Sequence, residues 1–543
     1  MEKTKSKKIY LIAMTLLLLA QIAVLFVYGS QKVGFHEDEL YSYYSSNKTA
    51  GLFVKDGEWV TGESLKDELM VLPGEQFRYW VVKQMQSWDV HPPFYYYLLH
   101  TVCSLTPGVF SKWQGIAVNI AGFVLSYLLL AYVSYTTVSM SERYRSGMSE
   151  WVSFLTCLCW GFSGATISGV MFIRMYQWLT VFVLLCLAIH IRAMRKEKYS
   201  VAGFYIPLGI TVFLGFLTQY YYMIFHVFLG AGFCIYLIWK KNWKRLAAYA
   251  GVCMVSFGAT LLYYPSALSH IFRGYRGNEA IGAFSDITNT WDRIQFFGEL
   301  FNEYVMGGFI AIWVLAICLL TVTRYSFKKR GRVFSPLLST PIKLILLAAF
   351  GYFFTVAKTA LLLGDTSNRY ELPIYGLFVF LLVDMVYEPW YEMVPLRSER
   401  RWQYLPAGFL AVLILISTIL GFANEKVLFL YSEEKELAEY VNSHTDTKAV
   451  VIYDEASADH MWWLLDELSC YKEVYMVSQE NEEEFSDNQL MEAEKLVVYV
   501  ADEKNAEECL DRLESSCGLD TEEEQIGVKN TWVVYEVGKS NIK

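Results

Sequence analysis

The chain has 543 residues, of which 54% are hydrophobic and 17% aromatic, and its formal net charge is -9. Its apolar residues arrive in blocks of about 18 to 24, the length that crosses a bilayer, so an ordinary soluble domain is excluded and a polytopic membrane protein is predicted. The sequence contains no nucleic-acid-binding patch and no phosphate-binding glycine loop.

The first apolar block, residues 9–28, follows four lysines between Lys3 and Lys8. Its length exceeds the roughly 7 to 15 residues of a cleavable signal core, which favours a retained signal-anchor helix. Ten further apolar blocks are expected at 114–138, 150–170, 175–192, 202–217, 219–239, 246–265, 304–323, 342–363, 372–388 and 404–423. We therefore expect a membrane all-α domain with about eleven transmembrane helices.

Lys- and Arg-rich segments, such as 240–245 and 324–332, occur in every second loop between these blocks, so under an eleven-span count they all lie on the same side of the membrane. Such loops stay in the cytoplasm, which places the N-terminus inside and the intervening loops outside. The apolar segment 92–107 is short and opens with Pro92-Pro93, so we expect an interfacial or re-entrant helix there. Interfacial helices in the first outer loop preserve this orientation.

The first outward motif follows the first span and contains Asp38 and Glu39, with Tyr41 to Tyr44 after them. This pattern predicts a short amphipathic helix along the membrane interface. A carboxylate beside a low-dielectric boundary has a raised pKa, which suits a base that removes a proton from a hydroxyl. The alternative is a pair of acids that simply face solvent.

A second outward motif, Asp89-Val90-His91-Pro92-Pro93, combines an acid, a histidine and two prolines. Prolines start helices and disfavour a helical residue before them, so Asp89 and His91 are expected on a bend where a helix begins. His91 and the helix N-terminus can then face an anionic ligand. The alternative is a helix cap with a surface histidine.

Two arginines occupy outward connections between spans. Arg174 lies in the tight connection 172–176, and Arg369 lies beside Asn368 and Tyr370. Either arginine can serve as an interface anchor whose charge reaches the headgroups. Two arginines on the same face as an acid pair favour a bound phosphate more than either does alone.

The composition changes sharply after Phe422. Residues 425–543 contain 30 acidic and 10 basic residues, whereas the rest of the chain carries a formal charge of +11. We therefore expect a transmembrane domain at 1–424 and an acidic extracytoplasmic α/β domain at 425–543. Strands are expected at 449–453, 474–477, 496–500 and 532–537, and helices near 433–443, 457–468 and 504–515.

Motifs between residues 9 and 424 resemble those of the multi-span glycosyltransferases of the GT-C fold. The group is the broad one of glycosyltransferase family 39 type, which includes protein O-mannosyltransferases and the aminoarabinose transferases of lipid A. The matching motifs are Asp38-Glu39, His91-Pro92-Pro93-Phe94-Tyr95-Tyr96, Arg174-Met175-Tyr176, Thr218-Gln219-Tyr220-Tyr221 and Asn368-Arg369-Tyr370.

The resemblance implies transfer of a sugar from a polyprenyl-phosphate donor, with inversion, to a glycan, lipid or protein acceptor outside a bacterial cell membrane. Asp38 would be the catalytic carboxylate, supported by Glu39. The donor phosphate would be bound by His91, Arg174 and Arg369. The remaining pocket residues would be Asp89, Tyr176, Gln219, Tyr220 and Tyr370.

Two departures from the family pattern concern the site. Gln219 stands where relatives often have histidine, and Glu37 adds a third acid beside Asp38. No cofactor is required by the motifs, but His36, Glu37, Asp38 and Asp89 offer ligands for a divalent cation, so metal use stays open.

The alternative function is transport or flipping of lipid-linked saccharides, and a third is a scaffold in an envelope-polymer complex. A transporter places ionisable groups near the bilayer midplane, often beside broken helices. The acids and arginines of this chain are expected at the outer boundary, which favours an enzyme.

Overall fold

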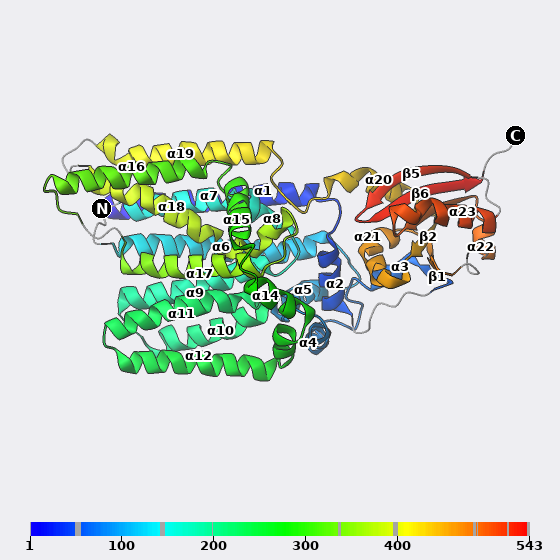
Figure 1. Ribbon diagram of the computed structural model, residues 1–543, viewed down its shortest axis with the longest axis horizontal. Coiled ribbons are helices and arrows are strands. Elements are labelled where there is room, and N and C mark those ends of the chain that lie inside the picture. Colours follow the sequence, from blue (N-terminus) through cyan, green and yellow to red (C-terminus); the bar gives the residue numbers. More distant parts are fainter. Residues whose placement is uncertain are drawn as a thin grey trace. The chain divides into compact units, whose positions relative to one another are not determined.

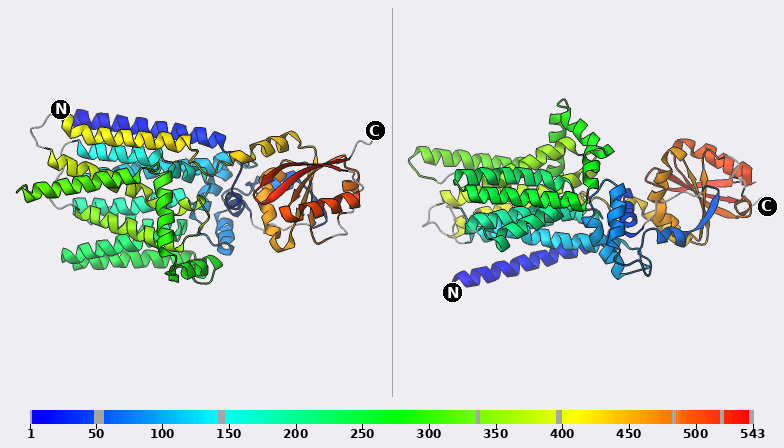
Figure 2. Two further views of the ribbon diagram at one scale, coloured as in Figure 1. Left: turned by 45° about the horizontal axis from the view of Figure 1, so that its top comes forward. Right: turned by 90° about the horizontal axis from the view of Figure 1, so that it is seen from below.

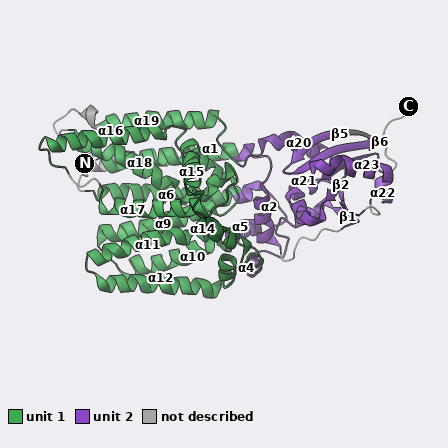
Figure 3. Cartoon of the chain, viewed as in Figure 1, with its two compact units in different colours: residues 1–28, 86–95, 116–428 green, residues 29–85, 96–115, 429–543 purple. Residues whose placement is uncertain are grey.

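The computed structural model describes residues 2–48, 56–141, 147–197, 199–334, 338–394, 400–481, 485, 487–517 and 521–539. Their contacts divide the chain into two compact units (Figure 3). Unit 1 comprises Met1–Tyr28, Gln86–Tyr95 and Ile116–Leu428, and unit 2 comprises Gly29–Met85, Tyr96–Gly115 and Phe429–Lys543.

Long helices that run side by side make up most of unit 1 (Figures 1 and 2). They are α1 (Glu2–Gln31), α6 (Lys112–Ser139), α7 (Met148–Gly161), α9 (Tyr176–Lys196), α10 (Ile206–Thr218), α11 (Tyr221–Trp239), α12 (Trp243–Tyr263), α16 (Ile310–Lys329), α17 (Thr340–Thr359), α18 (Leu372–Met393) and α19 (Arg400–Ala423). The connecting elements are α8 (Gly164–Met171), η1 (Val201–Tyr205), α13 (Ser266–Phe272), α14 (Tyr275–Ser285), α15 (Thr290–Tyr304) and η2 (Thr366–Tyr370).

Ten helices of the described chain are long and apolar enough to cross a membrane, or eleven when one bent pair is taken as a single span. The expectation of about eleven transmembrane helices is confirmed. The chain is therefore an integral membrane protein, since lipid offers no partners for backbone polar groups and helices satisfy them internally.

Two spans differ from their expected form. The segment expected at 150–170 is bent by 57° between α7 and α8, where Ser163 caps the new helix by accepting a hydrogen bond from the amide of Thr166. The span expected from 304 begins at Ile310, because α15 ends at Tyr304 and two glycines with positive φ, Gly307 and Gly308, turn the chain.

The first outer loop is helical, as expected. Its elements are α2 (Glu37–Asn47), α3 (Gly62–Asp67), α4 (Tyr79–Trp88) and α5 (Phe94–Leu105). Because α5 starts directly after Pro93 and has 12 residues, it is too short to span a bilayer. Residues 89–93 form the bend between α4 and α5, as the prolines predicted.

Unit 2 contains a six-stranded sheet in the order β1-β3-β2-β4-β6-β5. The strands are β1 (Glu58–Thr61), β2 (Lys448–Tyr453), β3 (Glu473–Ser478), β4 (Lys495–Val500), β5 (Thr521–Lys529) and β6 (Trp532–Lys539), and the tail helices are η3 (Ser432–Glu434), α20 (Lys435–Ser443), η4 (Glu455–Leu464), α21 (Leu465–Leu468), α22 (Asn488–Met491), η6 (Glu503–Asn505) and α23 (Ala506–Cys517). The central strands β3, β2 and β4 are parallel and almost wholly buried, as their continuous apolar runs require.

The expected C-terminal α/β domain is confirmed, with two differences in detail. Residues 521–529 form an additional strand, β5, and most of the helix expected at 457–468 is a 3-10 helix. The division expected after residue 424 corresponds to Leu428/Phe429, but unit 2 also takes in 29–85 and 96–115 from the first outer loop. The strand β1 of that loop pairs antiparallel with β3 at the sheet edge.

Candidate functional site

The expected acid pair lies in the first turn of α2 in unit 2. His36 is the N-cap of this helix, and its Nδ1 accepts a hydrogen bond of 3.0 Å from the amide of Asp38. The carboxylate of Glu39 reaches back to the amide of His36 at 2.7 Å. Together they form a capping box, which fixes the backbone at both acids.

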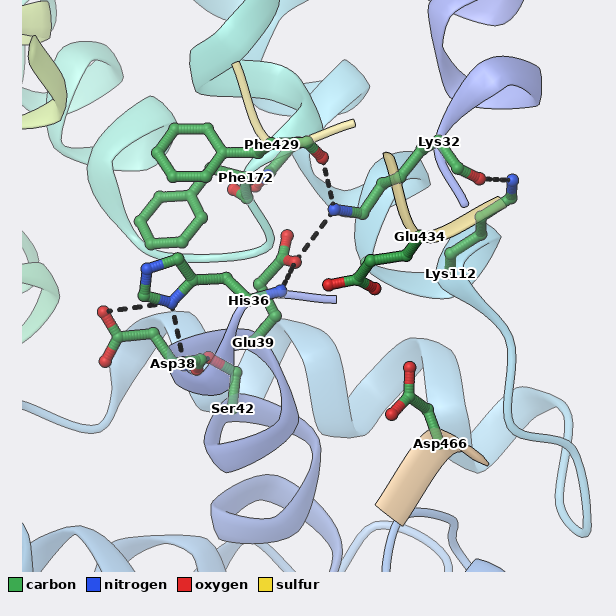
Figure 4. A network of polar contacts seen from close by, with 12 residues as sticks. Lys32, His36, Asp38, Glu39, Ser42, Lys112, Phe172, Phe429, Glu434 and Asp466 are labelled. Carbon is green, nitrogen blue, oxygen red and sulfur yellow. Dashed lines mark hydrogen bonds and ion pairs between the residues drawn. The ribbon is translucent and has the colours of Figure 1, made fainter. Parts of the chain in front are cut away.

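Glu39 is fully buried and paired with Lys32 (Figure 4). Lys32 Nζ lies 2.9 Å from Glu39 Oε2 and donates a second hydrogen bond of 2.7 Å to the carbonyl of Phe429. Burial lowers the pKa of Lys32, and the charge of Glu39 opposes that shift. Glu39 is thus engaged as a helix cap and counter-ion.

Asp38, in contrast, keeps 29% of its side-chain surface exposed. Its Oδ2 lies 3.8 Å from His36 Nδ1, and that nitrogen accepts the hydrogen bond from the Asp38 amide. A nitrogen that accepts carries no proton, so His36 is assigned as the Nε2–H tautomer. Of the expected pair, Asp38 is the acid that can meet a substrate.

The bend between α4 and α5 in unit 1 holds a second polar cluster. His91 Nδ1 lies 3.0 Å from Asp89 Oδ2, and the guanidinium of Arg174 contacts the ring at 3.3 Å from Nε2. An ionised carboxylate only accepts, so Nδ1 donates to Asp89. Arg174 Nη2 also lies 3.5 Å from Nδ1, so it is close to both ring nitrogens and not aimed at one of them. Burial disfavours the charged form of Asp89, but His91 and Arg174 outweigh it, and the pKa of Asp89 lies below its ordinary value.

Two residues that sequence analysis missed support this bend. Tyr264 donates a hydrogen bond to the carbonyl of His91 at 3.2 Å. His270 bridges Ser87 O, at 3.2 Å, and the hydroxyl of Tyr220, at 2.9 Å. Burial lowers the pKa of His270, so its neutral ring donates from Nε2 and accepts at Nδ1. Tyr264 and His270 are both more than 170 residues from the bend in the sequence, and no motif around them indicates a contact with it.

Arg369 lies in an aromatic setting on η2 in unit 1. Its guanidinium stands over the rings of Phe172 and Tyr370, with distances of 5.0 and 5.2 Å to the centroids. The ring of Tyr370 meets Tyr176 edge-on at 5.6 Å. Because Phe172 also accepts a hydrogen bond from the amide of Arg174, both arginines border the connection between α8 and α9.

The remaining expected pocket residues have local roles. Gln219 is the C-cap of α10, and its side-chain oxygen accepts a hydrogen bond from the amide of Tyr221 at 3.4 Å. The ring of Tyr221 lies 6.1 Å from that of Tyr370. A further acid, Glu371, was not anticipated. It is fully buried, its carboxyl oxygens have no hydrogen-bond partner in the described part of the chain, and burial raises its pKa well above the ordinary value.

A buried charge cluster lies within the tail of unit 2. Lys529 pairs with three carboxylates, Asp466 at 2.7 Å, Glu434 at 3.1 Å and Glu467 at 3.4 Å. Burial raises the pKa of Glu434 to about 7, and Lys529 opposes this rise. A Cβ atom at position 34 would lie 2.0 Å from Glu434 Oε2, so a larger residue there would displace this carboxylate. Figure 4 shows Glu434 and Asp466 in this part of unit 2.

Among the described residues, no group of three or more His, Cys, Asp or Glu side chains could hold a metal ion. Of the residues named for a divalent cation, Asp89 belongs to unit 1, and His36, Glu37 and Asp38 belong to unit 2. His36 also uses Nδ1 to cap α2.

The structure brings Asp89, His91 and Arg174 into one cluster and joins Arg369, Tyr370 and Tyr176 beside it in unit 1. Asp38 and Glu39 belong to unit 2. Tyr220 touches the first cluster indirectly through His270.

No protein-family model matches the chain, and no curated protein matches it. Among solved structures it is similar to ArnT from Cupriavidus metallidurans bound to undecaprenyl phosphate, with a TM-score of 0.49, 12% identity, and coverage of 96% of this chain and 97% of that chain. It is likewise similar to the same protein in the apo state, with a TM-score of 0.49, 13% identity and the same coverage.

Proposed function

We propose that this protein is an integral-membrane glycosyltransferase that transfers a sugar from a polyprenyl-phosphate donor to an acceptor on the outer face of the membrane. The observation that carries the proposal is the gathering of Arg174, His91 and Asp89 outside the spans, with Arg369 bordering the same connection. A phosphate needs such convergent donors, and arginine provides them in a planar fork.

Each group has a role in the proposed reaction. Arg174 and Arg369 bind the phosphate of the donor and stabilise the charge that grows on it as the sugar leaves. His91, held by Asp89, positions the guanidinium of Arg174. Asp38 removes the proton from the acceptor, since its carboxylate is partly exposed and sits on a fixed helix start. Glu39 supports that helix start.

The orientation follows the same proposal. The N-terminus lies in the cytoplasm, and the acidic tail lies outside with the first loop, with which it forms one compact unit. The sugar acceptor is a glycan, a lipid or a protein on that side.

The test is a transfer assay with the purified full-length protein in lipid nanodiscs and a panel of polyprenyl-phosphate sugars, following release of the polyprenyl phosphate. We expect one donor class to be consumed and Asp38→Asn to abolish transfer while retaining the wild-type thermal unfolding temperature. Full transfer by Asp38→Asn would remove the proposed base. Movement of a fluorescent lipid-linked sugar across proteoliposomes without transfer would instead favour the flippase.

A further inference from the structure

The buried pair of Lys32 and Glu39 connects the acid loop to the first residues of the tail. Lys32 Nζ bridges Glu39 Oε2, at 2.9 Å, and the carbonyl of Phe429, at 2.7 Å, and neither charged side chain has any exposed surface. The same Glu39 oxygen accepts the hydrogen bond from the His36 amide. One carboxylate oxygen therefore links the cation to the helix cap next to Asp38.

The tail adopts an unusual backbone to supply these contacts. Phe429 and Tyr431 have φ values of 66° and 55°, a left-handed region that residues with side chains rarely occupy. Between them, the carbonyl of Leu430 accepts a hydrogen bond of 2.7 Å from the amide of Val33. The elbow 429–431 thus offers two successive carbonyls to Lys32 and Val33.

Aromatic rings enclose the elbow and the cation. Lys32 Nζ lies 5.2 Å from the centroid of Tyr431 and 5.7 Å from that of Phe35. The ring of His36, the cap residue, meets Phe429 edge-on at 5.9 Å. Figure 4 shows Lys32 between Glu39 and Phe429, with His36 and Asp38 on the neighbouring turn.

We infer that Lys32 is a positioning residue for Asp38: through Glu39 it locks the first turn of α2 onto the strained elbow 429–431, so the tail sets the place of the proposed base. This inference rests on the proposed function. A buried pair of this kind is weak evidence for stability, because desolvation offsets the attraction, but it is well suited to fixing one arrangement. The strained elbow also fixes one arrangement, because an unfavourable backbone conformation persists only where the surrounding contacts hold it in place.

The first experiment compares Lys32→Met with Lys32→Arg and with the double variant Lys32→Met/Glu39→Gln in nanodiscs. The double variant removes both buried charges together, so it restores thermal stability that Lys32→Met loses. We expect Lys32→Met to lower kcat at least tenfold with less than a threefold change in donor KM. Lys32→Arg, which keeps the positive charge, should retain a higher kcat than Lys32→Met. The double variant should recover the unfolding temperature and not kcat.

A matched control is Lys112→Met, which removes a neighbouring lysine whose Nζ donates to the backbone carbonyls of Ser30 and Lys32 and lies 6.0 Å from the centroid of the Trp113 ring. It should leave kcat within threefold of the wild type. Wild-type kcat in the double variant would overturn the inference, because the Lys32–Glu39 pair would then contribute to stability only. Full kcat in Lys32→Met would do the same.

A second readout does not depend on transfer. In an Asp38→Cys background, labelling by a charged thiol reagent reports how firmly the turn holds position 38, and adding Lys32→Met should speed labelling at least fivefold. An unchanged rate would overturn the inference even if the protein had no transferase activity. Absence of transfer by the wild-type protein from every donor in the panel, or full transfer by Asp38→Asn, would overturn the proposed function instead.

Discussion

Two polar centres of the molecule differ in how much of their charge meets solvent. In unit 2, Lys32 and Glu39 expose no side-chain surface, and each has its partners within the protein. In unit 1, His91 and Asp89 expose 20% and 37% of their side chains. A buried and satisfied pair holds a shape, whereas partly open groups around a guanidinium can still receive a ligand.

The same difference in exposure distinguishes two acids that are adjacent in the sequence. Asp38 and Glu39 are neighbours, yet one is partly exposed and the other is a buried counter-ion. The difference arises from the helix start, because a capping box turns the third helical residue back toward the cap and leaves the second outward. Of the two acids, exposure therefore favours Asp38 as the proposed base, and Glu39 is the helix cap and counter-ion.

The largest effect on the open centre is expected from removing Arg369, the arginine that borders the same connection between α8 and α9. Arg369→Ala should raise the donor KM, or lower kcat/KM, about 100- to 1,000-fold, since two charge-assisted hydrogen bonds to phosphate are worth roughly 3 to 4 kcal/mol. Arg369→Lys should recover only part, because an ammonium group cannot bind bidentately. Donor titration of the purified variants measures this, and an unchanged KM in Arg369→Ala would contradict the assignment.

A smaller effect is expected from the acid that holds His91. Asp89→Asn keeps an oxygen that accepts from His91 Nδ1 but loses the charge, so we expect a three- to tenfold rise in donor KM. Because the pKa of Asp89 is depressed, its charge is present above that pKa and is lost as the pH falls through it. The acidic limb of the plot of kcat/KM against pH should therefore change in the variant. An identical plot would show that the charge of Asp89 does not act on donor binding.

The smallest effect on activity is expected in the closed part of unit 2. Glu434 faces Lys529, Asp466, Glu467 and Lys32, and its pKa of about 7 in the folded state exceeds the ordinary 4.5. The folded protein then binds more protons at Glu434 between these values, so the contribution of Glu434 to stability is fully present below pH 4.5 and is lost as the pH rises through 7, by roughly 3 kcal/mol at most.

Glu434→Gln should flatten this dependence. Unfolding temperatures measured at pH 5.5 and pH 8 should differ less in the variant than in the wild type, with kcat at pH 7 within about threefold. Equal pH dependence in both proteins would show that another group in the cluster carries the titration.

The transmembrane helices were predictable because a bilayer imposes a length on apolar segments, and the central strands because strands buried on both faces read as continuous apolar runs. The start of α5 followed from Pro92 and Pro93. Local rules of this kind need no knowledge of distant residues.

The missed features all depend on distant partners. Lys32 is seven residues from Glu39, but its second partner is Phe429, and nothing near Lys32 indicates a buried lysine. The strand β1 has four residues, too few for a period to be recognised, and it is a strand because β3 lies beside it. Tyr264 and His270 contact the bend at His91 and Ser87 only after the chain has crossed the membrane several times.

The pairing of β1 with β3 also sets an order for biosynthesis. Glu58 is opposite Met476, so the early strand emerges roughly 400 residues before its partner exists. At about 5 to 20 residues per second, the ribosome leaves it waiting for tens of seconds. An unpaired strand edge invites pairing with other chains during such a delay. Its shortness and its flanking acids, Glu58 and Glu63, reduce that hazard until translation is complete.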